Sequence, residues 1–301
     1  MNFATLRSLA IPEGNVTQIT IGGVTVWVSS KPVKLQVKKI TSDTYAAETT
    51  YTGEQFILLD IYPKSADSVV KVTYGGITKT LTFSGTNSMP VYFGTFNGVS
   101  DSVATPESGT LTISGDYLAF SVGTYSGNNK NIPTPCGCIT GVDDFGDLKF
   151  IVSSAFYSCA ELTLSSLPSS ITSVAMSAFY QCKSLQFNDN FFSNGLVTIG
   201  DTAFTYANVE ETLFTFNITI PETVTSIGKN AFAGNSTQSG DYTYFKRVRV
   251  LPKTPPVAGN EIFGQIAPNY PFSIVVPKGC GDAYKAAEGW SNYADYITEE
   301  A

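Results

Sequence analysis

The second half of the chain repeats one pattern of apolar residues. An Ala-Phe pair recurs at Phe156, Phe179, Phe204 and Phe232, with Ile-Phe at Phe263, so the repeat is 23 to 31 residues long. Repeats of this length are typical of solenoids, in which each unit buries its apolar side only against its neighbours. The pattern predicts a solenoid over residues 139–301 and a function that depends on a surface more than on a catalytic cleft.

Within each unit, apolar and polar residues alternate before the Ala-Phe pair. In the fullest unit, residues 213–232, the strand pattern ends at Pro221 and Gly228 turns the chain. Period-two alternation points successive side chains to opposite faces. Aligning the units predicts an outward row that we expect to bind a partner: Thr163, Gln186, Thr219, Arg249 and Val275. A second outward row consists of Glu161, Ser184, Asn217, Arg247 and Ser273. Of these residues, only Arg247 is added to the predicted partner-binding set.

The first half alternates in shorter segments. Residues 16–21 and 24–28 flank Gly22-Gly23 and predict a β-hairpin. An isolated hairpin is marginal in water, so residues 1–30 are expected to be an anchoring segment. Seven more strands predict an immunoglobulin-like β-sandwich over residues 31–127. They are Val33–Ile40, Gln55–Tyr62, Ser68–Tyr74, Ile77–Phe83, Val91–Phe96, Gly109–Ser114 and Tyr117–Val122.

Two other segments complete the predicted organisation. Residues 128–138 are rich in Gly, Asn and Pro and are expected to be a linker. Residues 282–288 contain good helix formers, with Asp282 as the expected N-cap and Gly289 as terminator. The predicted fold class is mainly β: a β-sandwich followed by a short solenoid with a C-terminal helical cap.

The amino-acid composition excludes several kinds of active site and binding partner. The chain has no His, which excludes Ser-His-Asp and Cys-His catalysis and His metal ligation. The net charge of −7 disfavours nucleic acid and anionic lipid as partners, and no apolar stretch is long enough for membrane insertion. The acidic groups Asp143-Asp144, Asp147 and Glu210-Glu211 are interpreted as solvated loops. We therefore predict no enzymatic activity and neither a cofactor nor a metal.

Cysteines allow two interpretations. Cys136-Gly-Cys138 lacks the second ligand pair that a metal site needs, which makes it a weak metal or redox motif. Cys159 and Cys182 recur three residues after the repeat phenylalanine, so we expect them to fill buried layers as small apolar residues.

The pieces of the repeat, in their order, resemble BspA-like leucine-rich repeats over about residues 139–297. That bacterial subclass has the pattern strand-IP-xx-VTSIG-xx-AF-xx-C-xx-L. The matching pieces are Ile220-Pro221, Val224-Thr225-Ser226-Ile227-Gly228 and Val197-Thr198-Ile199-Gly200, with Cys159 and Cys182 at the Cys position and Leu162 and Leu185 at the following Leu. The resemblance implies a leucine-rich-repeat solenoid and, as its usual role, adhesion at a bacterial cell surface.

The N-terminal segment, residues 1–30, suggests a different biological role from adhesion at a cell surface. Residues 9–27 are similar to short leader hairpins on phage structural proteins of Gram-positive gut bacteria, and residues 1–16 lack the features of a signal peptide. The function expected from this resemblance is a non-enzymatic phage or prophage virion structural protein of decoration, tail or receptor-binding type, assembled in the bacterial cytoplasm. Its hairpin would bind other virion proteins, and its solenoid a host surface protein or glycan. The alternative is a cell-surface BspA-like adhesin.

Overall fold

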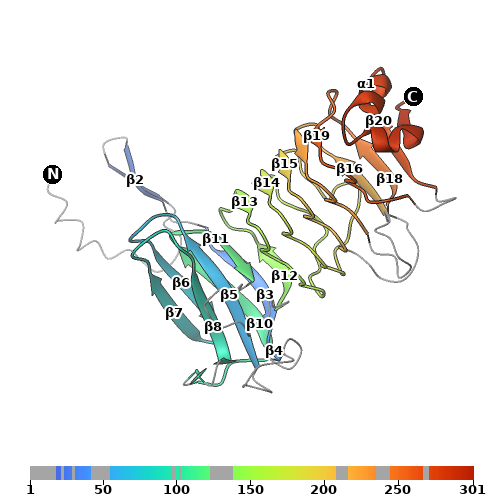
Figure 1. Ribbon diagram of the computed structural model, residues 1–301. Helices are drawn as coiled ribbons and strands as arrows, with labels where there is room; N and C mark the ends of the chain where they lie inside the picture. Colours follow the sequence, from blue (N-terminus) through green and yellow to red (C-terminus); the bar gives the residue numbers. More distant parts are fainter. Residues whose placement is uncertain are drawn as a thin grey trace.

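The computed structural model describes residues 18–21, 24–28, 31–41, 55–96, 99–101, 103–122, 138–207, 216–234, 245–266 and 271–301. In Figure 1 a two-sheet β domain is followed by stacked coils that end in a helical cap at the C-terminus. The mainly β class is confirmed. Within these ranges no helix has the length and apolar character needed to cross a membrane.

Two antiparallel sheets form the N-terminal domain. Their strand orders are β12-β3-β10-β6-β7 and β11-β5-β8-β9, with β4 beside β5. The rings of Tyr74 and Phe93, one from each sheet, lie 5.7 Å apart in the shared core. The bounds are β3 Val33–Lys38, β4 Ile40–Thr41, β5 Gln55–Pro63, β6 Val69–Tyr74, β7 Ile77–Thr82, β8 Met89–Phe96, β9 Val99–Ser100, β10 Ser108–Gly115, β11 Tyr117–Val122 and β12 Ile139–Asp144. All seven predicted strands are present.

The strand order differs from that of an immunoglobulin constant domain. In that arrangement the first and second strands are neighbours. Here β3 lies between β10 and β12, whereas β5 lies between β11 and β8 in the other sheet. The domain therefore has two antiparallel sheets but not the immunoglobulin strand order, because β3 lies beside β12, the strand that enters the solenoid.

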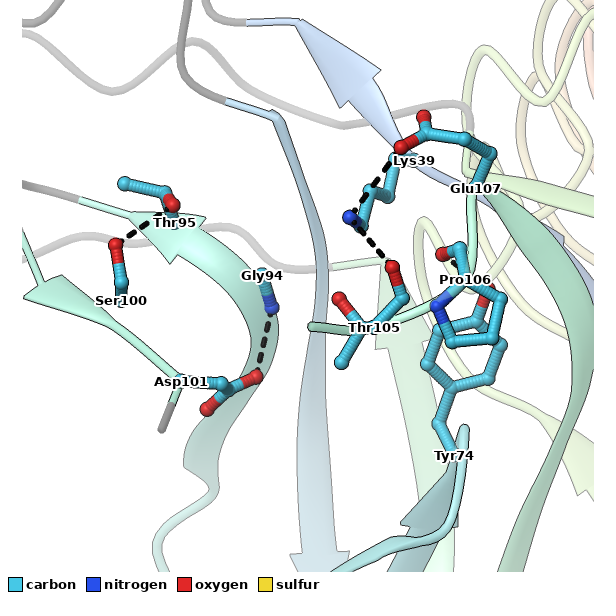
Figure 2. A network of polar contacts seen from close by, with 9 residues as sticks. All are labelled: Lys39, Tyr74, Gly94, Thr95, Ser100, Asp101, Thr105, Pro106 and Glu107. Atoms are coloured by element: carbon cyan, nitrogen blue, oxygen red, sulfur yellow. Dashed lines mark hydrogen bonds and ion pairs between the residues drawn. The ribbon is translucent and has the colours of Figure 1, made fainter. Parts of the chain in front are cut away.

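Polar contacts cluster at one end of this domain (Figure 2). Tyr74 Oη donates to the Pro106 carbonyl at 2.8 Å, and Asp101 Oδ2 accepts the Gly94 N–H at 2.8 Å. Lys79 on β7 reaches Asp101 at 2.7 Å, and the Asp101 side chain is only 10% exposed. Because Lys79 is on β7 of one sheet and Asp101 directly follows β9 of the other, this ion pair connects the two sheets. An inward-pointing Lys also protects an edge strand from pairing with another chain.

Two short hairpins are present in the described residues. Gly75 and Gly76 have φ of 56° and 80° between β6 and β7, as a two-residue turn of type I′ requires. Near the N-terminus, β1 (Gln18–Ile21) and β2 (Val24–Val28) pair antiparallel with Ile21 opposite Val24. Among the strands that the structure describes, these two pair only with each other. The rest of the segment 1–30 lies outside the described residues, as do residues 123–137, which contain nearly all of the predicted linker.

The solenoid contains two parallel sheets. One sheet consists of β13 (Phe150–Ile151), β14 (Ser173–Val174), β15 (Thr198–Ile199), β17 (Ser226–Ile227) and β19 (Val257–Ala258). The other consists of β16 (Phe216–Ile220), β18 (Phe245–Val250), β20 (Ser273–Val276) and β21 (Ile297–Glu299). We call the outward side of this second sheet, with the aligned segments 161–165 and 184–190 of the earlier coils, the strand face.

The Ala-Phe pairs occupy a third side of the coils, which is irregular. The repeat phenylalanines are buried and stack face to face along the array, for example Phe179 on Phe204 at 5.1 Å with an interplanar angle of 5°. The residue before each Ala has a left-handed backbone, as Ser177 does with φ of 55°, and its N–H donates to the next coil. On this side, hydrogen bonds between neighbouring coils therefore pair the backbone N–H groups that a helix would pair within itself.

The repeat cysteines fill the layers as predicted. Cys159 and Cys182 are buried free thiols, and Cys182 Sγ donates to the Phe156 carbonyl at 2.9 Å. Burial raises the pKa of both thiols, so neither has thiolate character at neutral pH. Cys138 is also buried, and Cys136 lies outside the described residues.

The two halves meet at β12. This strand pairs antiparallel with β3, and its Gly141 also forms a parallel bridge with Thr163 in the first coil. The Phe120 and Phe156 rings meet edge to face at 5.5 Å, and the Val122 N–H donates to the Ala155 carbonyl at 3.0 Å. The predicted boundary at residue 139 thus falls on a strand shared by both parts, and the β domain covers the first coil.

The C-terminal cap contains more than the predicted helix. It comprises α1 (Gly281–Ala286), a 3-10 helix (Ser291–Tyr296) and β21. Asp282 lies in the first turn of α1 and is not its N-cap, which is Cys280. The predicted N-cap was wrong because Glu299 of β21 accepts the Gly279 and Gly281 N–H groups, at 2.9 and 2.7 Å. The predicted terminator was also wrong, since the helix ends with Ala287 as C-cap, before Gly289.

Candidate functional site: the strand face

The predicted outward rows exist on the strand face. Thr219 lies beside Arg249 and Arg249 beside Val275, while Arg247 lies between Asn217 and Ser273. The flanking apolar residues of these strands are buried: Ile218, Ile220, Val248, Val250, Ile274 and Val276. Parallel pairing in register therefore turns the predicted residues outward.

The earlier coils continue these rows without regular strands. The Thr163 N–H donates to the Thr140 carbonyl at 3.0 Å, and the Gln186 N–H to the Leu164 carbonyl at 2.9 Å. Thr163 and Gln186 are both exposed. All six predicted residues are therefore at least partly exposed, although only some of them lie close to one another.

A hollow of about 560 Å³ opens on this face. Three of the predicted residues line it, namely Thr219, Arg247 and Arg249, while Thr163, Gln186 and Val275 do not. The remaining lining residues are Asp189, Asn190, Phe192, Ser193, Asn194, Pro221 and Leu251. Ligand sites in proteins commonly have volumes of about 300–1,000 Å³. The hollow is therefore large enough for a small molecule or one part of a larger partner.

Both arginines of the hollow are held by carboxylates. Asp189 accepts a hydrogen bond from Thr219 Oγ1 at 3.1 Å and one from Arg247 at 3.3 Å. Arg249 Nε donates to Glu300 at 2.6 Å. The arginine side chains remain 45% and 47% exposed, and such exposed pairs add little stability. Their main effect is to fix the orientation of the guanidinium groups.

The sequence interpretation missed the acidic and amide residues of this hollow. Asn188-Asp189-Asn190 directly follow the strand-like segment of their coil, and this polar run was the available signal for Asp189 and Asn190. Glu300 is distant in sequence and reaches Arg249 only because β21 adds a fourth strand beside β20. No local pattern around Glu300 predicts that placement.

The acidic groups noted in the sequence have structural partners. Asp143 accepts a hydrogen bond from Gln36 at 2.5 Å, and Asp147 accepts the Lys31 N–H at 2.6 Å. Burial raises the pKa of Asp144, but hydrogen bonds from Lys31 and Gly146 outweigh it and leave that pKa below its ordinary value. These carboxylates hold β12 to the β domain. Glu210 and Glu211 lie outside the described residues.

Among the described residues, no group of three or more His, Cys, Asp or Glu side chains converges to hold an ion. The ionisable side chains of the hollow are instead paired as donors and acceptors, which suits recognition through hydrogen bonds.

Comparison with known proteins agrees with this geometry. A comparison with curated proteins gives no match. Residues 149–240 match the family described as "BspA type Leucine rich repeat region (6 copies)". Residues 149–240 are therefore similar to a BspA-type leucine-rich repeat region, in agreement with the resemblance of the repeat pattern.

Proposed function

We propose that this chain is a non-enzymatic, adhesin-like interaction protein that presents the strand face of its solenoid to a partner. The observation that carries the proposal is the hollow, in which side chains from three coils meet around two oriented arginines. Leucine-rich-repeat solenoids are typical of interaction proteins, and their extended sheets serve as binding surfaces.

Rigidity supports this role. Thr219, Arg247 and Arg249 of the hollow stand on paired strands whose inward neighbours are fully buried. Polar groups that are fixed before binding lose little conformational entropy when a partner arrives. A preorganised surface of this kind gives affinity from few contacts.

A binding assay with whole cells tests the proposal. The labelled full-length chain is added to a panel of bacterial and epithelial cells, and bound label is measured by flow cytometry. The double variant Gln186→Ala/Arg249→Ala is expected to lose binding. Lys246→Ala removes a positive charge from the same strand outside the hollow and is expected to bind like the parent. Equal binding by the double variant and the parent would contradict the proposal.

The finer proposal is a phage or prophage virion protein, with an immunoglobulin-like β domain as the spacer between particle and solenoid. It is supported by the leader resemblance and by the β1–β2 hairpin, which pairs with no other strand in the described ranges and is available to bind other virion proteins. The solenoid would then face the host surface, and the alternative remains a cell-surface adhesin. Mass spectrometry of purified particles from a producing strain is the test. Detection in particles supports the virion role, whereas enrichment in the cell-wall fraction supports the adhesin.

A further inference from the structure

We propose that the hollow on the strand face is a binding site for a neutral carbohydrate, such as an uncharged unit of a surface glycan. This inference rests on the proposed function, since it assigns a ligand class to the same face. Three properties of the hollow carry it: balanced charge, unused hydrogen-bonding capacity and a small apolar floor.

The charge of the hollow is already balanced. Arg247 is paired with Asp189 and Arg249 with Glu300, both through nitrogen–oxygen contacts of 3.3 Å or less. An anionic ligand would have to displace a carboxylate that is connected to the same chain. A cationic ligand would meet the two arginines. A neutral ligand avoids both costs and leaves the ion pairs intact.

Hydrogen-bonding capacity remains after these pairs have formed. A guanidinium group has five N–H donors, and the Arg249 contacts with Glu300 involve only its Nε and one terminal nitrogen. Asn190 and Asn194 are exposed at the rim of the hollow and offer both donors and acceptors.

This mixture matches a sugar better than a peptide. Each sugar hydroxyl both donates and accepts, so it can bridge a guanidinium N–H and a carboxylate or amide oxygen in the same site. The apolar residues Phe192, Pro221 and Leu251 can pack against the C–H groups of a sugar ring. An amphipathic peptide helix requires a continuous apolar groove, whereas seven of the ten lining residues here are polar.

The direct test uses the full-length chain on an array of immobilised oligosaccharides. The probes are neutral hexose and N-acetylhexosamine oligomers, with sialylated and sulfated oligosaccharides for comparison. We expect binding to at least one neutral probe. Arg249→Ala should weaken it about tenfold or more, because a hydrogen bond to a charged group is lost. Lys246→Ala should leave it unchanged.

Asp189→Asn gives the sharper discrimination. The amide keeps the size of the carboxylate but leaves Arg247 without a counter-charge, so binding should shift from neutral towards sialylated or sulfated probes. Circular dichroism establishes that each variant is folded. Anionic binding by the parent chain, or Asp189→Asn that binds neutral probes as before, would overturn the charge argument.

The cell assay separates failure of this inference from failure of the proposed function. Periodate cleaves the vicinal diols of sugars, whereas protease removes surface proteins. Loss of cell binding after periodate supports the carbohydrate site. Cell binding that requires Arg249, survives periodate and is lost after protease refutes the carbohydrate while the proposed function stands. If Gln186→Ala/Arg249→Ala does not reduce cell binding, the proposed function fails first.

Discussion

Three consecutive coils have a glycine at the same position, where it determines how closely they stack, and Gly228 is the place to test it. Added to Gly228, a Cβ atom would lie 2.5 Å from the Gly200 carbonyl carbon, where ordinary contact begins at 3.4 Å. Gly200 and Gly259 occupy the same position in neighbouring coils, and a Cβ there would lie 2.7 Å and 2.4 Å, respectively, from the nearest backbone atom of the preceding coil. Gly228→Ala therefore pushes two coils apart by about 1 Å, the distance needed to restore van der Waals contact.

The hydrogen bonds between these coils set the cost of the substitution. The Gly228 N–H donates to the Ile199 carbonyl at 2.8 Å, and the Lys229 N–H donates to Asp201 Oδ1 at 2.7 Å. Lengthening by about 1 Å breaks both, which costs about 1 kcal/mol for the neutral bond and about 2 kcal/mol for the bond to a carboxylate. The smaller entropy of the unfolded Ala chain returns about 0.4–1 kcal/mol. We expect a net loss of about 2–3 kcal/mol in the free energy of unfolding.

Urea unfolding followed by circular dichroism measures this loss. For slopes of about 1–3 kcal/mol/M, the midpoint should fall by about 1 M or more. Gly85→Ala is the matched control, since a Cβ there meets nothing within 4 Å and its φ lies outside the left-handed region. A Gly228→Ala chain that unfolds at the same urea concentration as Gly85→Ala would refute the close-packing argument.

Three further predictions concern the ends of the solenoid. Tyr293→Phe leaves the Phe263 N–H and the Gly264 carbonyl without their partner, so urea unfolding should show a loss of about 2–4 kcal/mol. Glu161→Ala should lower the free energy of unfolding by less than about 1 kcal/mol, because its ion pair with Lys38 is exposed. Phe156→Ala should lower it by about 3–5 kcal/mol, because the ring is buried. The reverse order of the two losses in urea unfolding would show that charge, not packing, stabilises the junction. Burial raises the pKa of Tyr117 to about 12, so its stabilising effect is complete below the ordinary pKa near 10 and is lost as pH rises through about 12. Absorbance titration should show this late tyrosine, and it should vanish in Tyr117→Phe.

The repeat pattern predicted the parts of the structure that depend on local sequence. Burial of one apolar set per coil fixes which side chains point outward, so the positions of Thr219, Arg247 and Arg249 followed from alternation alone. The glycine pair at residues 75 and 76 is likewise a local signal for a turn, because few other residues adopt positive φ.

Features that depend on contacts distant in sequence could not be predicted. Asp282 has the side chain of an N-cap, yet Glu299 reaches the helix start from a strand formed later in the chain. The hollow requires Asp189 and Arg247 to meet across 58 residues. Strand order belongs to the same class, since alternation specifies which residues point inward but not which strand lies beside β3.

Both ends of the solenoid are covered, and this directs binding to its sides. At the first coil, β12 and Phe120 occupy the apolar layer that would otherwise be open. At the last coil, Trp290 Nε1 donates to the Pro256 carbonyl at 2.8 Å and Tyr284 Oη to the Pro252 carbonyl at 2.6 Å. A stacked array with free ends could extend by adding another copy, as open parallel strands do. Because these ends are closed, the surfaces left for a partner are lateral, and the strand face contains the hollow in which oriented charge, unused donors and apolar contact coincide.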